Sequence, residues 1–287
     1  MRQHTLYSTI LTTCMFALAC GAALCTTVSH AAGIFPDANL ERAVRRYVFE
    51  RRNNDQPLTA DDVRSISTIE AKGAGIKDLT GLEACVGLAL LDLENNEISN
   101  LAPLSELRRL QSLNLAGNQI QDLAPLANLE KLQYLQLEHN QVEDLKPLAG
   151  LVNLNSCYLS GNKIADLAPL QQLNKLWSLY LNENQVKDIA PLAGLTRLST
   201  LALRGNQITD AGPLKDYTDL KHLFLENNGI TDLATLVDMA RRDHEGAMRF
   251  SPFWHIYLSG NPLSDSALDE QIVELRKLGA SLALEEK

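Results

Sequence analysis

Basic residues, aromatic residues and cysteines are all scarce in this sequence of 287 residues. Asp and Glu outnumber Lys and Arg by 35 to 26, which gives a formal net charge of −9, and no basic run reverses this balance locally. Because binding to nucleic acid needs clustered Lys and Arg, a nucleic-acid partner is not expected. Aromatic residues make up only 5% of a chain that is 45% apolar, so the core must be mostly aliphatic.

Cysteines and catalytic motifs are equally limited. Three of the five cysteines (Cys14, Cys20, Cys25) lie within the first 31 residues, which leaves Cys85 and Cys157. Two cysteines do not make a disulfide framework, so stability must come from packing. The sequence contains no HExxH, GxSxG, P-loop or GxGxxG motif, and neither an enzyme, a cofactor nor a metal site is expected.

The first 31 residues have the pattern of an export signal. Arg2 is followed by a charge-free apolar stretch over residues 6–28, and Ser29-His30-Ala31 places small residues before a cleavage site after Ala31. Two alternatives stay open: a retained membrane helix, or lipidation of Cys20, which follows Phe-Ala-Leu-Ala. The expected location is secreted or extracytoplasmic, in the periplasm or at the cell surface, with a lipoprotein as the variant.

An internal repeat of 22 residues dominates the rest of the chain. Its consensus is LxxLxLxxNxIxDLxPLxxLxx, and its asparagines recur in unbroken phase at Asn96, Asn118, Asn140, Asn162, Asn184, Asn206 and Asn228. The alternation in LxxLxL predicts a short strand with inward leucines. The buried Asn carries both donors and an acceptor, so stacked copies can satisfy the backbone of neighbouring turns.

The second half of the repeat predicts a short return segment. An Asp near its start can accept hydrogen bonds from free backbone N–H groups, and the following Pro fixes φ and discourages a long helix. These aspartates are Asp78, Asp122, Asp144, Asp166, Asp188, Asp210 and Asp232. The expected fold is therefore a leucine-rich-repeat solenoid of about nine turns, with a concave parallel β-sheet and 3₁₀ or extended segments on the convex side.

The 22-residue unit resembles that of the internalin-type bacterial leucine-rich-repeat proteins, over roughly residues 34–279. This resemblance implies an extracellular or surface protein that binds other macromolecules on its concave sheet.

The ends of a solenoid need caps because they would otherwise expose core residues. We expect a signal peptide over 1–31 and one domain over 32–287, with an N-terminal cap at 34–65, repeats at 66–263 and a C-terminal cap at 264–287. The N-terminal cap should contain a helix with Leu40, Val44, Tyr47 and Val48 on its apolar face, then a short helix capped by Thr59 with Asp62. Near the C-terminus, residues 233–250 predict an inserted convex helix, and Ser266 should cap a last helix over 267–278.

Two pairs of residues invite chemical interpretations. Cys85 and Cys157 occupy leucine positions about three turns apart, or ~15 Å, which is too far for a disulfide, so both are expected as inert core thiols. His222 and His255 share a position on adjacent strands and could contribute to a metal site. Such a site needs at least one more protein ligand, and Thr200, the next residue in the same row, is a poor metal ligand. A polar contact surface is therefore the preferred interpretation.

The outward position between the last two strand leucines changes character along the chain. It reads Glu70, Asp92, Asn114, Gln136, Tyr158, Tyr180, Ala202, Phe224 and Tyr257. Either these rings only stack along the sheet, or they form a contact surface, since clustered exposed aromatics often anchor interfaces. The predicted partner-binding residues are Tyr134, Tyr158, Trp177, Tyr180, Arg204, His222, Phe224 and Tyr257. Ala202 should open a notch between Tyr180 and Phe224.

The sequence therefore predicts an exported, monomeric repeat protein that binds a protein partner, or a peptide or glycan, on its concave face. The alternative is a structural protein of the cell envelope, anchored by a lipid on Cys20.

Mass spectrometry of the mature N-terminus tests export. We expect the first 31 residues to be removed and the mature chain to begin at Ala32, because the apolar stretch ends in a cleavage pattern there. A lipid-modified N-terminus at Cys20 would establish the anchored alternative, and a retained Met1 would contradict export by this signal.

Overall fold

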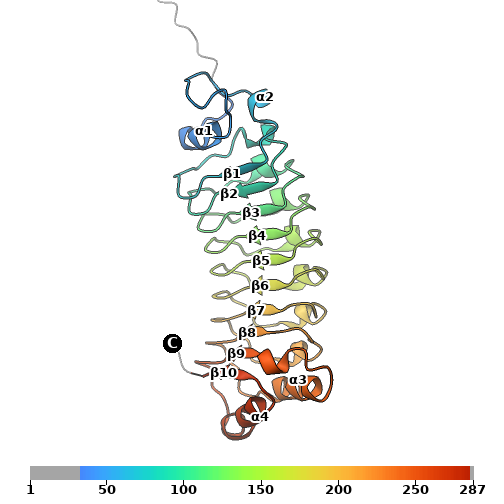
Figure 1. Cartoon of the computed structure of the whole chain (residues 1–287). Helices are drawn as coiled ribbons and strands as arrows, with labels where there is room; N and C mark the ends of the chain where they lie inside the picture. The colour runs from blue at the N-terminus through green and yellow to red at the C-terminus, as the bar shows by residue number, and fades with distance from the viewer. Residues whose placement is uncertain (1–32, 285–287) are drawn as a thin grey trace, which may run out of the picture. The chain divides into compact units, whose positions relative to one another are not determined.

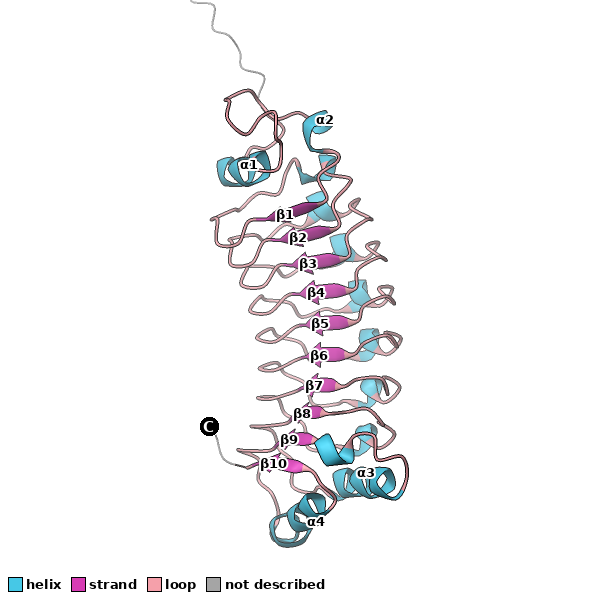
Figure 2. Ribbon diagram, in the orientation of Figure 1, coloured by secondary structure: helices cyan, strands magenta, loops and turns pink. Residues whose placement is uncertain are grey.

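The computed structural model describes residues 33–284 of the chain, and the predicted signal peptide with Cys20 lies outside the described residues. The unit that begins at Ala32 is a repeat solenoid whose strands lie side by side in one parallel sheet (Figures 1 and 2). The strands are β1 (Thr68–Glu70), β2 (Leu90–Asp92), β3 (Ser112–Asn114), β4 (Tyr134–Gln136), β5 (Ser156–Tyr158), β6 (Ser178–Tyr180), β7 (Thr200–Ala202), β8 (His222–Phe224), β9 (His255–Tyr257) and β10 (Ser281–Ala283). Their order in the sheet is their order in the sequence.

The leucine-rich-repeat fold is thus confirmed, with one strand more than the expected nine turns. Between β2 and β8, short 3₁₀ helices carry the chain back along the convex side: η2 (Ala102–Leu104), η3 (Ala124–Leu126), η4 (Lys146–Leu148), η5 (Ala168–Leu170), η6 (Ala190–Leu192) and η7 (Gly212–Leu214). Each has proline at its first or second helical position. Before η3 to η7 an Asp accepts the expected backbone hydrogen bond, as Asp166 does from Ala168 N at 2.8 Å, and before η2 Asn100 takes this role. The inward leucines of both faces form one aliphatic core with almost no exposed surface.

The asparagines of the repeat form a hydrogen-bonded ladder. In each copy Nδ2 donates to at least two carbonyl groups and Oδ1 accepts from at least one backbone N–H. Asn162, for example, donates to Leu137 O and Leu159 O, both at 2.9 Å, and accepts from Val142 N at 2.9 Å. One side chain therefore ties its own strand end to the preceding turn, and the ladder fixes the register between repeats.

The residue before each ladder asparagine makes a left-handed bend. Glycine occupies this position in alternate repeats, with positive φ at Gly117, Gly161, Gly205 and Gly260, and the other repeats use Asn95, His139, Glu183 and Asn227. The two kinds alternate because side chains from one repeat lie over the glycine of the next. A Cβ added at Gly161 would come within 2.6 Å of His139 Nδ1. The structural period of this edge is thus two repeats.

Helix α1 (Ala38–Arg45) and helix α2 (Ala60–Val63) form the N-terminal cap. Leu40, Val44 and Val48 are buried as expected, but Tyr47 lies at the margin, where its hydroxyl accepts a hydrogen bond from Glu70 N at 2.9 Å. Arg46 Nη2 donates to Glu70 O at 2.9 Å. These two side chains occupy backbone groups of β1 that would otherwise be left open at the end of the sheet.

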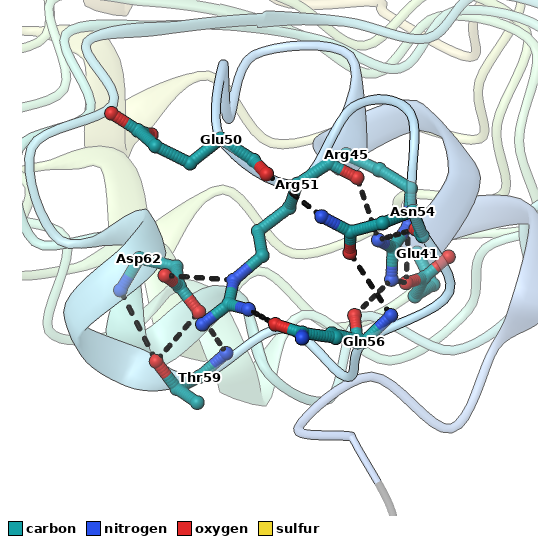
Figure 3. A network of polar contacts seen from close by, with 8 residues as sticks. All are labelled: Glu41, Arg45, Glu50, Arg51, Asn54, Gln56, Thr59 and Asp62. Atoms are coloured by element: carbon teal, nitrogen blue, oxygen red, sulfur yellow. Dashed lines mark hydrogen bonds and ion pairs between the residues drawn. The ribbon is translucent and has the colours of Figure 1, made fainter.

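A polar network holds the loop between α1 and α2 (Figure 3). The Arg45 guanidinium pairs with Glu41 and donates to the carbonyl groups of Arg51, Asn54 and Gln56 at 2.9, 2.7 and 2.9 Å. Arg51 pairs with Asp62 at 3.3 Å. Asp62 and Thr59 form the expected capping box of α2. Side-chain donors thus supply hydrogen bonds to the backbone carbonyl groups of a loop that has no regular secondary structure.

The C-terminal end confirms the inserted helix and corrects the last cap. Helix α3 (Ala234–Glu245) lies within the predicted 233–250 segment. A π-helical turn over Ala267–Gln271 continues into α4 (Ile272–Lys277). Its capping acceptor is the hydroxyl of Ser264, which accepts from Ala267 N at 3.2 Å, and not that of Ser266, which pairs with Glu270. Strand β10 then closes the sheet. Within residues 33–284, no helix is long and apolar enough to cross a bilayer.

Replacing a ladder asparagine should destabilise the fold strongly. Asn162→Ala removes four side-chain hydrogen bonds and leaves buried backbone groups without partners, so we expect a loss of about 3 kcal/mol in the free energy of unfolding. Urea denaturation followed by circular dichroism measures it. The control is Asn174→Ala, an exposed position outside the ladder, which should change stability by less than about 0.5 kcal/mol. Equal effects of the two substitutions would contradict the role of the ladder.

Candidate partner-binding surface

Strand register places the outward side chains of the sheet in straight rows. The row predicted from sequence is observed: Glu70, Asp92, Asn114, Gln136, Tyr158, Tyr180, Ala202, Phe224 and Tyr257 are successive partners across the strands. A second row contains Tyr134 on β4, Thr200 on β7, His222 on β8 and His255 on β9. Every inward residue between the rows is a buried core residue, so the outward side chains can vary without disturbing the core.

Six of these side chains belong to two groups of ring contacts, and His255 stacks on His222 beside the second group. We call Tyr134, Tyr158 and Tyr180 the tyrosine stack: the first pair has ring centroids 5.2 Å apart with planes at 51°, and the second pair lies 4.7 Å apart at 10°. The second group, the C-terminal ring group, joins Phe224 to Tyr257 at 4.4 Å and 10° and includes His222. These rings are half-buried. The geometry is therefore compatible both with lateral stacking alone and with a contact surface, since the rings stack on each other and still reach solvent.

The expected notch between the two groups is absent. Ala202 lies between Tyr180 and Phe224 in register, yet it retains only 1% of its exposure. Row spacing fixes where the side chains originate but not which way the large rings turn, and almost none of the alanine surface is open to solvent. Ala202 is therefore part of the packing and not the floor of an open slot.

Two of the predicted residues stand apart from the ring groups. Trp177 precedes β6 and is 51% exposed. Arg204 follows β7, is exposed, and its guanidinium makes no hydrogen bond or ion pair among the described residues. The structure thus brings together six of the eight predicted side chains along the sheet and leaves Trp177 and Arg204 at its margins.

A third outward row contains a residue that the sequence analysis missed. Glu138 follows β4, and its Oε2 atom is buried without a hydrogen-bond partner. Burial and the nearby charge of Glu94 raise the pKa of Glu138, although its own backbone N–H and His139 act in the opposite direction. Burial, Tyr158 and the charges of Glu138 and Asp92 also raise the pKa of Tyr134 to about 12. The sequence signal was only a Glu after the strand, which is indistinguishable from a solvated surface residue.

Comparison with known proteins agrees with this architecture. The model for leucine-rich repeats in two copies matches residues 108–150, 175–216 and 196–237. The crystal structure of internalin C2 from Listeria monocytogenes is 31% identical in sequence, with a TM-score of 0.67, over 80% of this chain and 94% of that one. The chain belongs to the internalin-like leucine-rich-repeat proteins.

Two more distant structures share the fold with this internalin-like chain. A leucine-rich-repeat protein of Leptospira interrogans is 20% identical, with a TM-score of 0.65, over 79% of this chain and 63% of that one. The ectodomain of the plant receptor kinase GASSHO1/SCHENGEN3 from Arabidopsis thaliana, solved in complex with CASPARIAN STRIP INTEGRITY FACTOR 2, is 23% identical, with a TM-score of 0.62, over 72% and 26%. A comparison with curated proteins gave no match.

The two cysteines of the internalin-like domain are free and fully buried, as expected. Cys157 takes the inward position of β5, and Cys85 follows the 3₁₀ helix η1 (Leu82–Ala84). Burial raises the pKa of each thiol to about 12, with smaller contributions from Glu83 for Cys85 and from Glu138 for Cys157. Thiols of such high pKa are poor nucleophiles at neutral pH, so they serve as small core residues.

The histidine pair of this internalin-like surface is a stacked contact. The rings of His222 and His255 lie 5.2 Å apart with planes at 8°. Among the described residues no group of three or more His, Cys, Asp and Glu side chains is arranged to hold a metal ion. Burial lowers the pKa of His222, and the charges of His255 and Lys221 act in the same direction.

This histidine should make the stability depend on pH. Because the pKa of His222 is lower in the folded state than its ordinary value of 6.5, the unfolded chain binds its proton more readily. The contribution to folding is complete above about pH 6.5 and falls as the pH drops toward the folded pKa. NMR titration of His222 should give a midpoint below 6.5, and His255→Gln should raise it by removing the like charge. A midpoint at or above 6.5 in the unmodified protein would contradict this.

Proposed function

We propose that this chain is an exported protein that binds a protein or peptide partner through its concave face, with the tyrosine stack and the C-terminal ring group as anchors. The observation that carries the proposal is the concentration of half-buried rings on one face of a chain with 5% aromatic residues. Rings that hold each other in fixed orientations lose little conformational freedom on binding, which favours their use as anchors.

The relatives support a binding role for this kind of scaffold. Leucine-rich-repeat proteins commonly mediate protein–protein binding and are typically not enzymes. The plant receptors GASSHO1/SCHENGEN3 and RGFR1 were each solved with a bound factor, the latter being a peptide hormone receptor in complex with RGF2. Export is supported by the pattern of residues 1–31, and we infer that residues 32–287 are the mature domain. Trp177 and Arg204 would contact a partner at the margin of the surface.

Single aromatic truncations test the assignment. We expect Tyr158→Ala and Phe224→Ala each to weaken partner binding by about 2 kcal/mol, the usual scale for an anchor residue. Each change removes only lateral ring contacts, worth about 0.2–1 kcal/mol per pair, so the fold should persist. A partner captured by the unmodified chain from native envelope and medium fractions would be measured by calorimetry against each variant.

The matched control is Phe49→Ala, because Phe49 is an aromatic residue that is 77% exposed in the N-terminal cap and belongs to neither ring group. Its removal should leave affinity unchanged. If Phe49→Ala weakens binding and the two concave substitutions do not, the partner uses the cap and the proposal fails.

A further inference from the structure

Strand β10 is the last strand of the sheet (Figure 2), and one of its edges is open. Ser281 N donates to Trp254 O and Ala283 O accepts from Leu258 N, both at 2.8 Å, so β9 uses backbone groups of Ser281 and Ala283. Because the direction of these groups alternates along a strand, the N–H and C=O groups of Leu282 point to the other side. Neither group has a partner among the described residues. We call this side of β10 the open edge.

The two ends of the solenoid differ in how their edge strands are protected. At the N-terminal end, Tyr47 and Arg46 form hydrogen bonds with the backbone of Glu70 on β1. No side chain of the described residues does this at the open edge. Residues 279–284 read Gly-Ala-Ser-Leu-Ala-Leu, so the charges and prolines with which edge strands usually avoid pairing are also missing. Such an edge is a template for a further strand.

The core is incompletely covered at the same end. Leu282 and Leu284 pack against the core but stay half-buried, whereas Ile256, the register partner of Leu282 one turn earlier, is 1% exposed. The helical part of the last turn also carries Leu268 and Val273, which are 48% and 43% exposed. Because an uncovered last turn leaves core residues in water, an additional apolar surface at this end would stabilise the solenoid.

We propose that the open edge pairs with the open edge of a second copy of this chain, which gives a two-fold symmetric dimer. In an antiparallel pair centred on Leu282, each copy of this residue donates its N–H to the C=O of the other copy and accepts the reciprocal bond. A single residue thus supplies both the donor and the acceptor. Such a contact is isologous, since the same patch serves on both copies. The dimer would replace the monomer expected from the sequence.

The side chains of β10 fit this occupant on both faces of the strand. On the concave side, Ser281 of each copy would lie opposite Ala283 of the other, and these are small residues where β9 has His255 and Tyr257. On the inward side the two copies of Leu282 would meet, so the core would continue from one copy into the next. The two-fold axis is perpendicular to the sheet, and both concave faces therefore open to the same side.

Charges in the last turn also favour a second copy. The helical segment over residues 267–277 has Asp269 and Glu270 in its first turn and Arg276 and Lys277 in its last. The two-fold axis sets the segments of the two copies antiparallel. The acidic end of one segment and the basic end of the other then lie on the same side of the interface, which is the arrangement that favours association.

Sedimentation velocity of the purified full chain over a wide range of concentrations tests the proposal. We expect a monomer–dimer equilibrium, and Ser281→Lys should weaken dimerisation by about tenfold or more, because it places a charge beside the paired edges. The matched control is Thr68→Lys. Thr68 holds the same outward row at the opposite end of the sheet, on the strand that Arg46 and Tyr47 protect. It should leave the equilibrium unchanged, and circular dichroism should show both variants folded.

Introduced cysteines test the register of the pair. Residues 281 and 283 of opposite copies would form a non-hydrogen-bonded pair with Cα atoms ~4.5 Å apart, which is within the range of a disulfide. The double variant Ser281→Cys with Ala283→Cys should therefore give a covalent dimer on mild oxidation. Ser281→Cys alone should not, because no second thiol lies opposite it, and the native Cys85 and Cys157 are buried.

Three outcomes would overturn the proposal. The first is a chain that stays monomeric at every concentration. The second is a dimer that Ser281→Lys leaves intact, and the third is equal cross-linking of the single and double cysteine variants, since both would mean that the copies meet elsewhere. None of these outcomes would affect the proposed binding on the concave face, which rests on other residues.

Discussion

The buried asparagine ladder is the interaction on which the rest of this structure depends. Each amide carries hydrogen bonds that would otherwise be missing at the bend between sheet and convex side, and it does so for two turns at once. A shift of one repeat by a single residue would remove these bonds and turn the leucines outward. The ladder therefore fixes the register, and the register decides which outward side chains become neighbours. The aromatic and acidic rows are consequences of that alignment.

The same periodicity explains what could be predicted from the sequence. The strands β2 to β9, the aspartate-capped convex turns, the inserted helix and the burial of Cys157 all follow from positions in a repeating unit. The predictions failed where the unit ends. Strand β10 keeps the alternating Leu282 and Leu284, but Gly279 and Lys287 stand where the repeat has its first leucine and its asparagine, so the consensus did not identify it. The choice between Ser264 and Ser266 as cap depends on one helical turn, which sequence signals do not resolve.

The candidate site was predictable as a set of positions but not as a shape. Which rings share a row follows from spacing, and the observed register agrees. Whether a row holds a notch or a closed surface depends on side-chain rotamers, and Ala202 is covered although its row suggested a gap. For Glu138 the sequence predicted too much exposure. A Glu at an outward position of the repeat looks solvent-exposed, yet its Oε2 atom is buried. How deeply a side chain of a row is buried depends on the neighbouring side chains, so it is known only once their conformations are known.

On the proposed binding face, the stacking geometry determines which chemical groups of a partner each part of the sheet favours. In the parallel pairs Tyr158–Tyr180 and Phe224–Tyr257, the rings cover each other's faces and present mainly their edges to a partner. Ring edges carry partial positive charge, and tyrosine hydroxyl groups can donate hydrogen bonds, so these groups favour apolar side chains and backbone carbonyl oxygens. A cation gains little over such edges. From Tyr134 on β4 to Tyr257 on β9 lie five strand spacings, or ~24 Å, which an extended segment of about seven or eight residues would span.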